Sequence, residues 1–275
     1  MFSPLNKKLL SAVLFTGSIF SAASVIADAT LHFTRGTGAK KETHNMIFIK
    51  DLHINLSQGA NGTAQNYSIF DANGEKIIHV NPEQKAYMVM DKATINEQVS
   101  KMKKSIEMMR AQMEERLKTM PADQQKMMRK MMEAQGLGPA SKEPPMPQKS
   151  HIKTGKWETI AGIGCEIVEV HTKQTKSEEL CVASETKMGL NANDAKAVVA
   201  MKKFMNYMAQ SARDIMPNQN TEEPFDGLPI RTRSYDPKGN LVNEIILDSI
   251  SKDSVAADKI AIPDGYQLVD TPQMH

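Results

Sequence analysis

The stretch NYSIFDANGEKIIHVNPEQKAYMVMD, residues 66–91, decides the fold. It contains three short runs of strand-forming residues, and turn residues separate these runs at Asp71–Gly74 and Asn81–Gln84. An asparagine followed by a glycine supplies the positive φ that a tight hairpin requires. Successive strand residues point to opposite faces, so one face can be covered while the other faces water. We therefore expect consecutive antiparallel strands here.

The same pattern of short strand-forming runs extends upstream to Asp28. The runs ATLHFTR, THNMIFIK and LHINLSQ are rich in β-branched and other apolar residues, and glycines at positions 59 and 62 follow the last of them. Short strands divided by turns in close succession predict an antiparallel meander over residues 28–91.

The hydrophobic period changes at Thr94. Apolar residues now recur at steps of three or four, which predicts a long amphipathic helix. Pro121 can begin a helix but not continue one, so a second helix is expected up to Gln135. The stretch 136–148 has four prolines and two glycines, which favours a Pro-rich linker over 136–150. The apolar stripe of this helical insertion, 95–135, begins with Ile95, Val99, Met102, Ile106, Met109, Met113, Leu117 and Met120.

Strand-forming runs return after the linker, as KTGKWETIAGIGCEIVEVHT (153–172) and SEELCVASET (177–186). A third amphipathic helix is predicted over 193–216, and Pro217 ends it. A hairpin with the turn DPKGN (236–240) follows. Because amphipathic helices must bury their apolar stripe against a sheet, we expect a single α+β domain over 28–275. The stripe of the third helix contains Val198, Met201, Met205, Met208, Ala212 and Ile215.

The first 27 residues have the pattern of a secretory signal peptide. Lys7 and Lys8 precede an apolar run, Leu9–Phe20, and Val25 and Ala27 occupy the small-residue positions before a cut ahead of Asp28. The apolar run is shorter than the ~20 residues that span a bilayer. We expect cleavage after Ala27 and export to the periplasm, with an uncleaved anchor as the alternative.

Charge and hydropathy argue against two classes of protein, nucleic-acid-binding proteins and proteins with a stable transmembrane anchor. The chain has 34 basic and 32 acidic residues, and removal of 1–27 takes away Lys7 and Lys8 and no acid. A formally neutral mature chain gives no reason to expect nucleic-acid binding, which needs a concentrated positive surface. No other apolar run is long enough for a stable transmembrane anchor.

The two cysteines are expected to pair. If residues 165–181 form a hairpin that turns near Lys173, paired positions add to 346, which places Cys165 directly opposite Cys181. Opposed residues have Cα atoms about 4.5 to 5.5 Å apart, a spacing that a disulfide tolerates. Export places the pair in an oxidising compartment. Two reduced, buried cysteines are the alternative if the chain is not exported.

Catalytic constellations are absent from the sequence. It has no GxSxG, HExxH, Walker-type or CxxC motif. Cys165 and His171 could act as nucleophile and base only if they touched, yet six residues of extended chain separate them by roughly 20 Å. We therefore expect no enzyme, no catalytic residue and no cofactor.

The 20 methionines allow three interpretations. The stripe Val99, Met102, Ile106, Met109 and Met113 could line a lid over an apolar ligand, since methionine adapts to varied shapes, or it could pack as core. Thioether sulfur also selects Cu(I). Met127, Met128, Met131 and Met132 are the candidate ligands, although no histidine lies between Asp91 and Ser150.

Several motifs together carry a resemblance. AYMVMD (86–91), TGKWETIAGIGCEIVEV (154–170), ELCVASE (179–185) and IPDGYQLV (262–269), with the Met-rich insertion, resemble a family of exported bacterial proteins of unknown function. That family is similar to the outer-membrane lipoprotein-carrier half-barrel group. The resemblance implies a curved antiparallel sheet, an unclosed half-barrel, whose concave face is covered by helices around a hydrophobic cavity.

These observations predict a non-enzymatic periplasmic protein. The expected partner is a hydrophobic small molecule, a lipid, or an acylated or unfolded polypeptide, bound between sheet and helical lid. A soft-metal or envelope-stress protein and a structural or partner-docking module are the alternatives. The oligomeric state is not determined by the sequence.

Overall fold

One sheet organises the part of the chain that this computed structural model describes, residues 28–37, 40–58, 66–134, 149–213 and 227–269. The strands are β1 (Ala29–Thr37), β2 (Lys40–Lys50), β3 (His53–Gln58), β4 (Tyr67–Asp71), β5 (Lys76–Asn81), β6 (Ala86–Asp91), β7 (Lys149–Ile160), β8 (Ile163–Thr172), β9 (Thr175–Ala183), β10 (Leu228–Tyr235), β11 (Leu241–Ser251) and β12 (Gln267–Leu268). The helices are α1 (Lys92–Lys118), α2 (Ala122–Ala134), α3 (Ala192–Arg213) and a short 3-10 turn, η1 (Ala257–Lys259).

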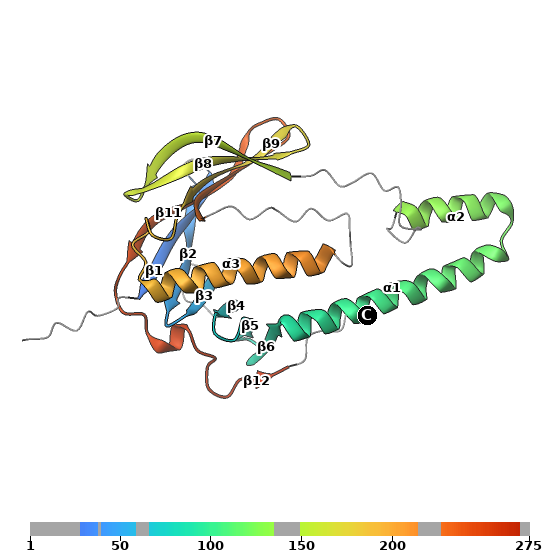
Figure 1. Cartoon of the computed structure of the whole chain (residues 1–275), viewed down its shortest axis with the longest axis horizontal. Coiled ribbons are helices and arrows are strands. Elements are labelled where there is room, and N and C mark those ends of the chain that lie inside the picture. Colours follow the sequence, from blue (N-terminus) through green and yellow to red (C-terminus); the bar gives the residue numbers. More distant parts are fainter. Residues whose placement is uncertain (1–27, 38–39, 59–65, 135–148, 214–226, 270–275) are drawn as a thin grey trace, which may run out of the picture.

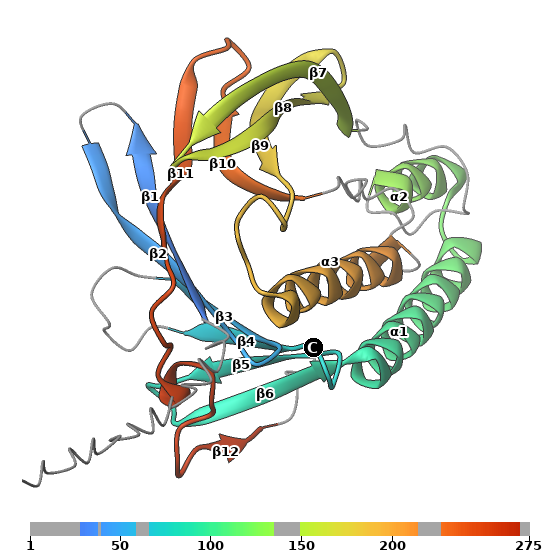
Figure 2. The ribbon, with the colours of Figure 1, turned by 60° about the vertical axis from the view of Figure 1, so that its left-hand side comes forward.

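The sheet has the order β12-β6-β5-β4-β3-β2-β1-β11-β10-β9-β8-β7. All neighbours are antiparallel except β12, which pairs in parallel with β6. The meander expected over 28–91 is therefore confirmed. The sheet bends around α3 and does not close into a barrel (Figure 2), which confirms the predicted α+β class with an open, curved sheet.

The β4–β5 hairpin forms where it was predicted, but by a different turn. Asp71 pairs with Lys76, which leaves a four-residue loop, and the residue with positive φ is Glu75, at 45°, not Gly74. The Asp71 carboxylate accepts the N–H groups of Asn73 and Gly74 at 2.9 and 3.0 Å. A Cβ at Gly74 would lie 2.8 Å from Oδ2 of Asp71, so a larger residue there would require the Asp71 carboxylate to shift.

Cys165 and Cys181 form a disulfide with a Cα separation of 5.3 Å, which confirms the predicted pair. The predicted register is wrong, because Cys181 lies opposite Ile167 and the paired positions add to 348. The turn pairs Thr172 with Thr175, and an irregularity next to Val170 shifts the register by one more residue. The disulfide therefore joins diagonal positions of β8 and β9.

Arg231 of β10 ties the curled half of the sheet together. Its buried guanidinium donates to Glu158 of β7 and, at 3.0 Å, to Glu179 of β9. Arg233 donates to Glu179 at 3.2 Å and to Glu244 of β11 at 2.7 Å. Charge-assisted bonds between partly buried groups are stronger than neutral ones, so this network supports the curvature of β7–β11.

α3 provides the central packing element. Phe204 is buried against Phe70 of β4, with ring centroids 5.7 Å apart. Val198 is buried in the same core, and Met201 and Met208 pack against it. Met205, which the sequence placed on this stripe, is instead 48% exposed. The larger Phe204 occupies that turn of the helix, and at 100° per residue its neighbour points away.

α1 and α2 extend beyond the end of α3 and away from the sheet (Figure 1). Asp91 caps α1 by accepting the Thr94 N–H at 2.7 Å. Ile95 and Leu117 are the buried residues of this helix. No helix of the described residues is long and apolar enough to cross a bilayer. The predicted signal peptide, the linker residues 136–148 and residues 214–216 of the third helix lie outside the described residues.

The packing of α3 can be tested with two neighbouring residues. Phe204→Ala should lower the free energy of unfolding by about 3–5 kcal/mol, because it removes a buried ring and leaves a cavity. Met205→Ala, the matched control, should change it by less than about 0.5 kcal/mol. Urea unfolding followed by circular dichroism measures both. Equal losses in the two variants would contradict the assigned helix face.

Candidate functional site

A partly open pocket of about 560 Å³ lies at one end of β4, β5 and β6. Leu56, Ser68, His79 and Met88 contribute to its lining. They share a strand face with residues of the main core, because Phe70, Ile77 and Met90 lie two positions from Ser68, His79 and Met88. The pocket therefore continues the apolar face that α3 covers. Its remaining lining residues are Asn66, Tyr67, Val80, Asn81, Gln84, Ala86, Tyr87 and Val269.

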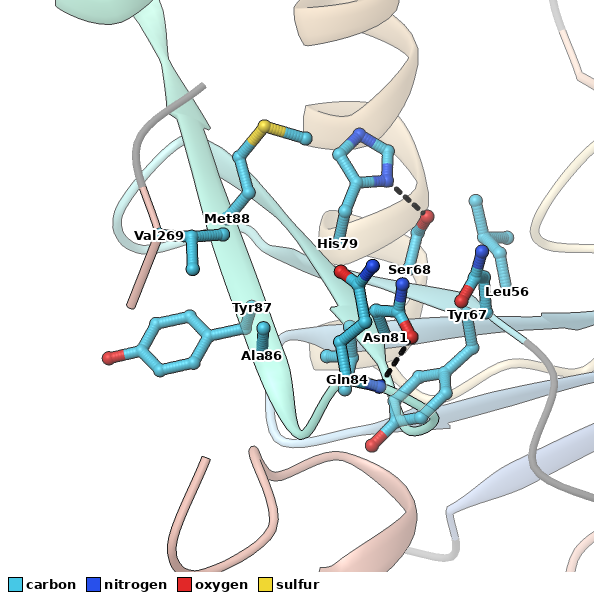
Figure 3. Close-up of a pocket in the computed structure, with 12 residues that line it drawn as sticks. Leu56, Tyr67, Ser68, His79, Asn81, Gln84, Ala86, Tyr87, Met88 and Val269 are labelled. Atoms are coloured by element: carbon cyan, nitrogen blue, oxygen red, sulfur yellow. Dashed lines mark hydrogen bonds between the residues drawn. The ribbon is translucent and has the colours of Figure 1, made fainter. Parts of the chain in front are cut away.

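Figure 3 shows how these side chains divide between the two sides of the strands. Met88 and His79 point to one side, whereas Tyr67 and Tyr87 point to the other. On that second side Ile69, Ile78 and Val80 form a separate buried cluster, against which Ile262 and Tyr266 pack. The ends of β4 and β5 that form the pocket are therefore packed on their second side against the segment after β11.

One polar pair lies inside the pocket. Ser68 Oγ and His79 Nδ1 are 2.8 Å apart, across neighbouring strands. Burial lowers the pKa of His79 below its ordinary value, because a low-dielectric environment disfavours the charged form. Near neutral pH the imidazole is therefore uncharged and its hydrogen bond to Ser68 is between neutral groups.

The rim of the pocket is polar. The Gln84 N–H donates to Asn81 Oδ1 at 3.1 Å within the β5–β6 turn. The C-terminal segment is attached beside it, since the Val269 N–H donates to the Tyr87 carbonyl at 2.9 Å. A mostly apolar lining with one polar pair inside and polar groups at the mouth suits a ligand that has an apolar tail and a polar end.

The predicted lid stripe lies elsewhere. None of its residues appears among the described residues that line the pocket. Val99 packs against the core, Met102, Ile106 and Met113 are half-buried, and Met109 is 44% exposed. The lid role of these five residues therefore stays a prediction.

The alternative copper ligands lie on α2. The Met127 side chain is 71% exposed and that of Met128 is half-buried, while the side chains of Met131 and Met132 lie outside the described residues. Within the described ranges, no group of three or more His, Cys, Asp or Glu could hold a metal ion. The soft-metal hypothesis, which depends on thioether ligands, stays a prediction.

Cys165 and His171 do not form a nucleophile and base. Cys165 is held in the disulfide, and Nε2 of His171 lies 3.0 Å from Oε2 of Glu169.

The sequence did not single out Ser68, His79 or Met88. Their only signature is position: each lies two residues from a buried apolar residue of the same strand, which predicts the face but not whether a helix covers it.

The family described as "Domain of unknown function (DUF4412)" matches residues 92–266. The chain belongs to this family. The DUF4412 match begins at α1 and includes both cysteines, whereas the pocket residues of β3–β6 precede it. No curated protein matches the sequence.

Three solved structures illustrate the likeness in fold. An uncharacterized conserved protein from Thermus thermophilus is 7% identical with a TM-score of 0.40, over 90% of this chain and 92% of that one. PNGF-II is 6% identical with a TM-score of 0.42, over 89% of this chain and 31% of that one. A chain of the Pseudomonas aeruginosa MucA/MucB complex is 9% identical with a TM-score of 0.28, over 85% of this chain and 55% of that one. At these values none of them supports a statement about ligand or activity.

The half-buried His79 predicts a pH dependence of stability. Since the pKa of His79 is lowered on folding, the unfolded state binds more protons as pH falls below about 6.5, so this group reduces stability toward acid. His79→Gln should therefore show a smaller loss of unfolding free energy between pH 7 and pH 5 than the wild type. Ser68→Ala, which keeps the imidazole, should retain the wild-type slope. Urea unfolding at several pH values measures this, and parallel curves for wild type and His79→Gln would contradict it.

Proposed function

We propose that this DUF4412 protein is a non-enzymatic periplasmic binding protein that holds an acyl chain in the pocket of β3–β6. The observation that carries the proposal is the partly open apolar pocket on the core face of the sheet. Its volume of about 560 Å³ falls in the range of about 300–1,000 Å³ that is typical of small-molecule sites. The acyl chain can belong to a lipid or to an acylated polypeptide.

The lining supports an apolar ligand with a defined orientation. Leu56 and Met88 offer apolar contacts on the core face, and methionine adapts to flexible chains. Asn81 and Gln84 lie beside the pocket mouth in the β5–β6 turn, where their amides can bond a carboxylate or ester. Burial of apolar ligand surface contributes about 25 cal/mol per Å², before the cost of immobilising the ligand.

The Ser68–His79 pair supports a positioning role rather than a catalytic one. A serine and histidine at 2.8 Å could in principle act as nucleophile and base. However, β4 pairs on both sides, with Leu56 and His79 flanking Ser68. Its backbone N–H groups are therefore directed into the ladder and are poorly placed to stabilise an oxyanion.

The export and the ligand class can be tested together. Native mass spectrometry of protein purified from the periplasm should reveal co-purified molecules, and denaturation should identify them as lipid or acylated peptide. Hydrolysis of a chromogenic acyl ester should remain at background. Ester turnover that is lost in Ser68→Ala would overturn the non-enzymatic proposal.

Filling the pocket should block binding. Met88→Trp places a larger side chain in the pocket, so a fluorescent fatty acid should bind at least about tenfold more weakly, equivalent to about 1.4 kcal/mol. Met108→Trp, at a residue that is 62% exposed on α1, is the matched control and should bind as the wild type. Probe titration and thermal unfolding on both variants separate loss of binding from loss of fold. Equal affinities in the two variants would place the site elsewhere.

The lid hypothesis has its own test. Met109→Glu should change the free energy of unfolding by less than about 0.5 kcal/mol, because Met109 is largely exposed. If the stripe closes over a ligand, this variant and Met113→Glu should nevertheless weaken fatty-acid binding, since a charge would be desolvated against an apolar chain. Unchanged affinity in both would confine the site to the pocket.

A further inference from the structure

A partly buried cluster of charges lies where the start of β1 meets the N-terminal end of α3 (Figure 1). Asp28, the first residue of the described chain, is only 8% exposed. Its carboxylate accepts bonds from Lys50 Nζ and the Val255 N–H, both at 2.8 Å. Asp28 is also the residue that the predicted signal-peptide cut would expose as a new N-terminus.

Asp194 lies in the first turn of α3 and is 1% exposed. Its N–H donates to Asn191 Oδ1 at 2.9 Å, and its Oδ2 accepts from Asn191 Nδ2 at 2.8 Å, so the Asn191 side chain caps the helix and also holds one oxygen of Asp194. The other carboxylate oxygen, Oδ1, is buried and has no hydrogen-bond partner among the described residues. A buried acceptor without a donor is costly, so this atom requires an explanation.

The buried carboxylate of Asp194 lacks a cationic partner among the described residues. Burial, together with the neighbouring carboxylates of Asp28 and Asp51, raises the pKa of Asp194 to about 6, although Lys252 lowers it in part. Of the two ammonium groups, Lys50 is bonded to Asp28, and Lys252 donates to the Gly189 carbonyl at 2.8 Å. Asp51 is exposed, so the buried carboxylates are those of Asp28 and Asp194. Lys50 pairs with the first, whereas Oδ1 of the second has no donor within the described part of the chain, and the positive end of the α3 dipole compensates it only in part.

We propose that the α-ammonium group created at Asp28 by signal-peptide cleavage pairs with the buried carboxylate of Asp194. Hydrolysis of the Ala27–Asp28 peptide bond by a signal peptidase consumes one water, leaving a carboxylate on Ala27 and an ammonium on Asp28. The new charge is carried by the residue whose side chain already acts on Asp194. It supplies the missing cation and a donor for Oδ1. The inference rests on the proposed export, and it couples completion of the α3–β1 junction to maturation.

The pairing predicts the direction in which the free energy of unfolding changes with pH. An ammonium beside a buried carboxylate has its pKa raised above the ordinary value of about 7.7–8.0. While Asp194 is ionised, the stability that the ammonium contributes is present below about pH 7.7 and is lost as pH rises through the raised pKa. Protonation of Asp194 removes it again toward acid. Lys50, Asp28, Asp51 and Lys252 face the same cluster, so a variant at Asp194 is needed to assign the effect.

The test uses the mature protein purified from the periplasm and the same protein acetylated at its α-amine. The pH dependence of α-amine labelling, followed by mass spectrometry, should give a pKa raised by at least about one unit, and acetylation should lower the urea midpoint at pH 7. Asp194→Asn keeps the capping geometry and should abolish both effects. Asp123→Asn, in the first turn of α2, is the matched control and should abolish neither.

Two results would overturn the inference. One is an α-amine that labels with an ordinary pKa in the wild type, together with equal urea midpoints for the free and acetylated forms. The other is a periplasmic protein whose N-terminus is not Asp28. Neither result bears on acyl-chain binding, which is read by probe titration and by Met88→Trp.

Discussion

The structure depends on the burial of one helix against a sheet that is wider than the helix. α3 inserts Phe204 against Phe70 and packs over β2 and β3. A helix with its side chains is about 10–12 Å across, and strands are about 4.8 Å apart, so one helix covers roughly two or three strands. The apolar face of the outer strands therefore continues past the cover. The pocket around His79 and Met88 is that uncovered continuation.

Because α3 alone covers the centre of the sheet, α1 and α3 have different roles. α3 serves as core, with Val198 and Phe204 buried. α1 contacts the body at its first turns, through Ile95 and Val99, and then leaves the sheet. Its more distal methionines, Met108 and Met109, are exposed. The methionines therefore occupy two environments, packed against the core, as Met201 and Met208 of α3 are, and exposed, as Met108 and Met109 of α1 are.

Electrostatic contacts hold the parts that apolar packing leaves open. In the curled half, Arg231 and Arg233 link β7, β9, β10 and β11 through Glu158, Glu179 and Glu244. At the α3–β1 junction, Asp28 bonds Lys50 and the segment after β11. The first network has a partner for each carboxylate, whereas the second leaves Asp194 Oδ1 without one among the described residues. Because a buried charge is stable only when it is compensated, the second cluster is where a further cation fits.

The sequence by itself determined the elements and their order. The spacing of apolar residues distinguishes strands from helices, and the turn residues Asp71–Gly74 and 236–240 identify hairpins. Both signals depend on neighbouring residues alone. It also predicted the Cys165–Cys181 pair. The register of that hairpin was missed, because the turn pairs Thr172 with Thr175 and a single-residue irregularity beside Val170 adds a second shift, which leaves no local signature. Only the tertiary structure decided which part of the apolar face α3 covers, and therefore that Ser68, His79 and Met88 line a pocket. It alone brought Asp28 and Asp194 together, because contacts between residues far apart in the chain depend on how the sheet curves and where the helix lies on it.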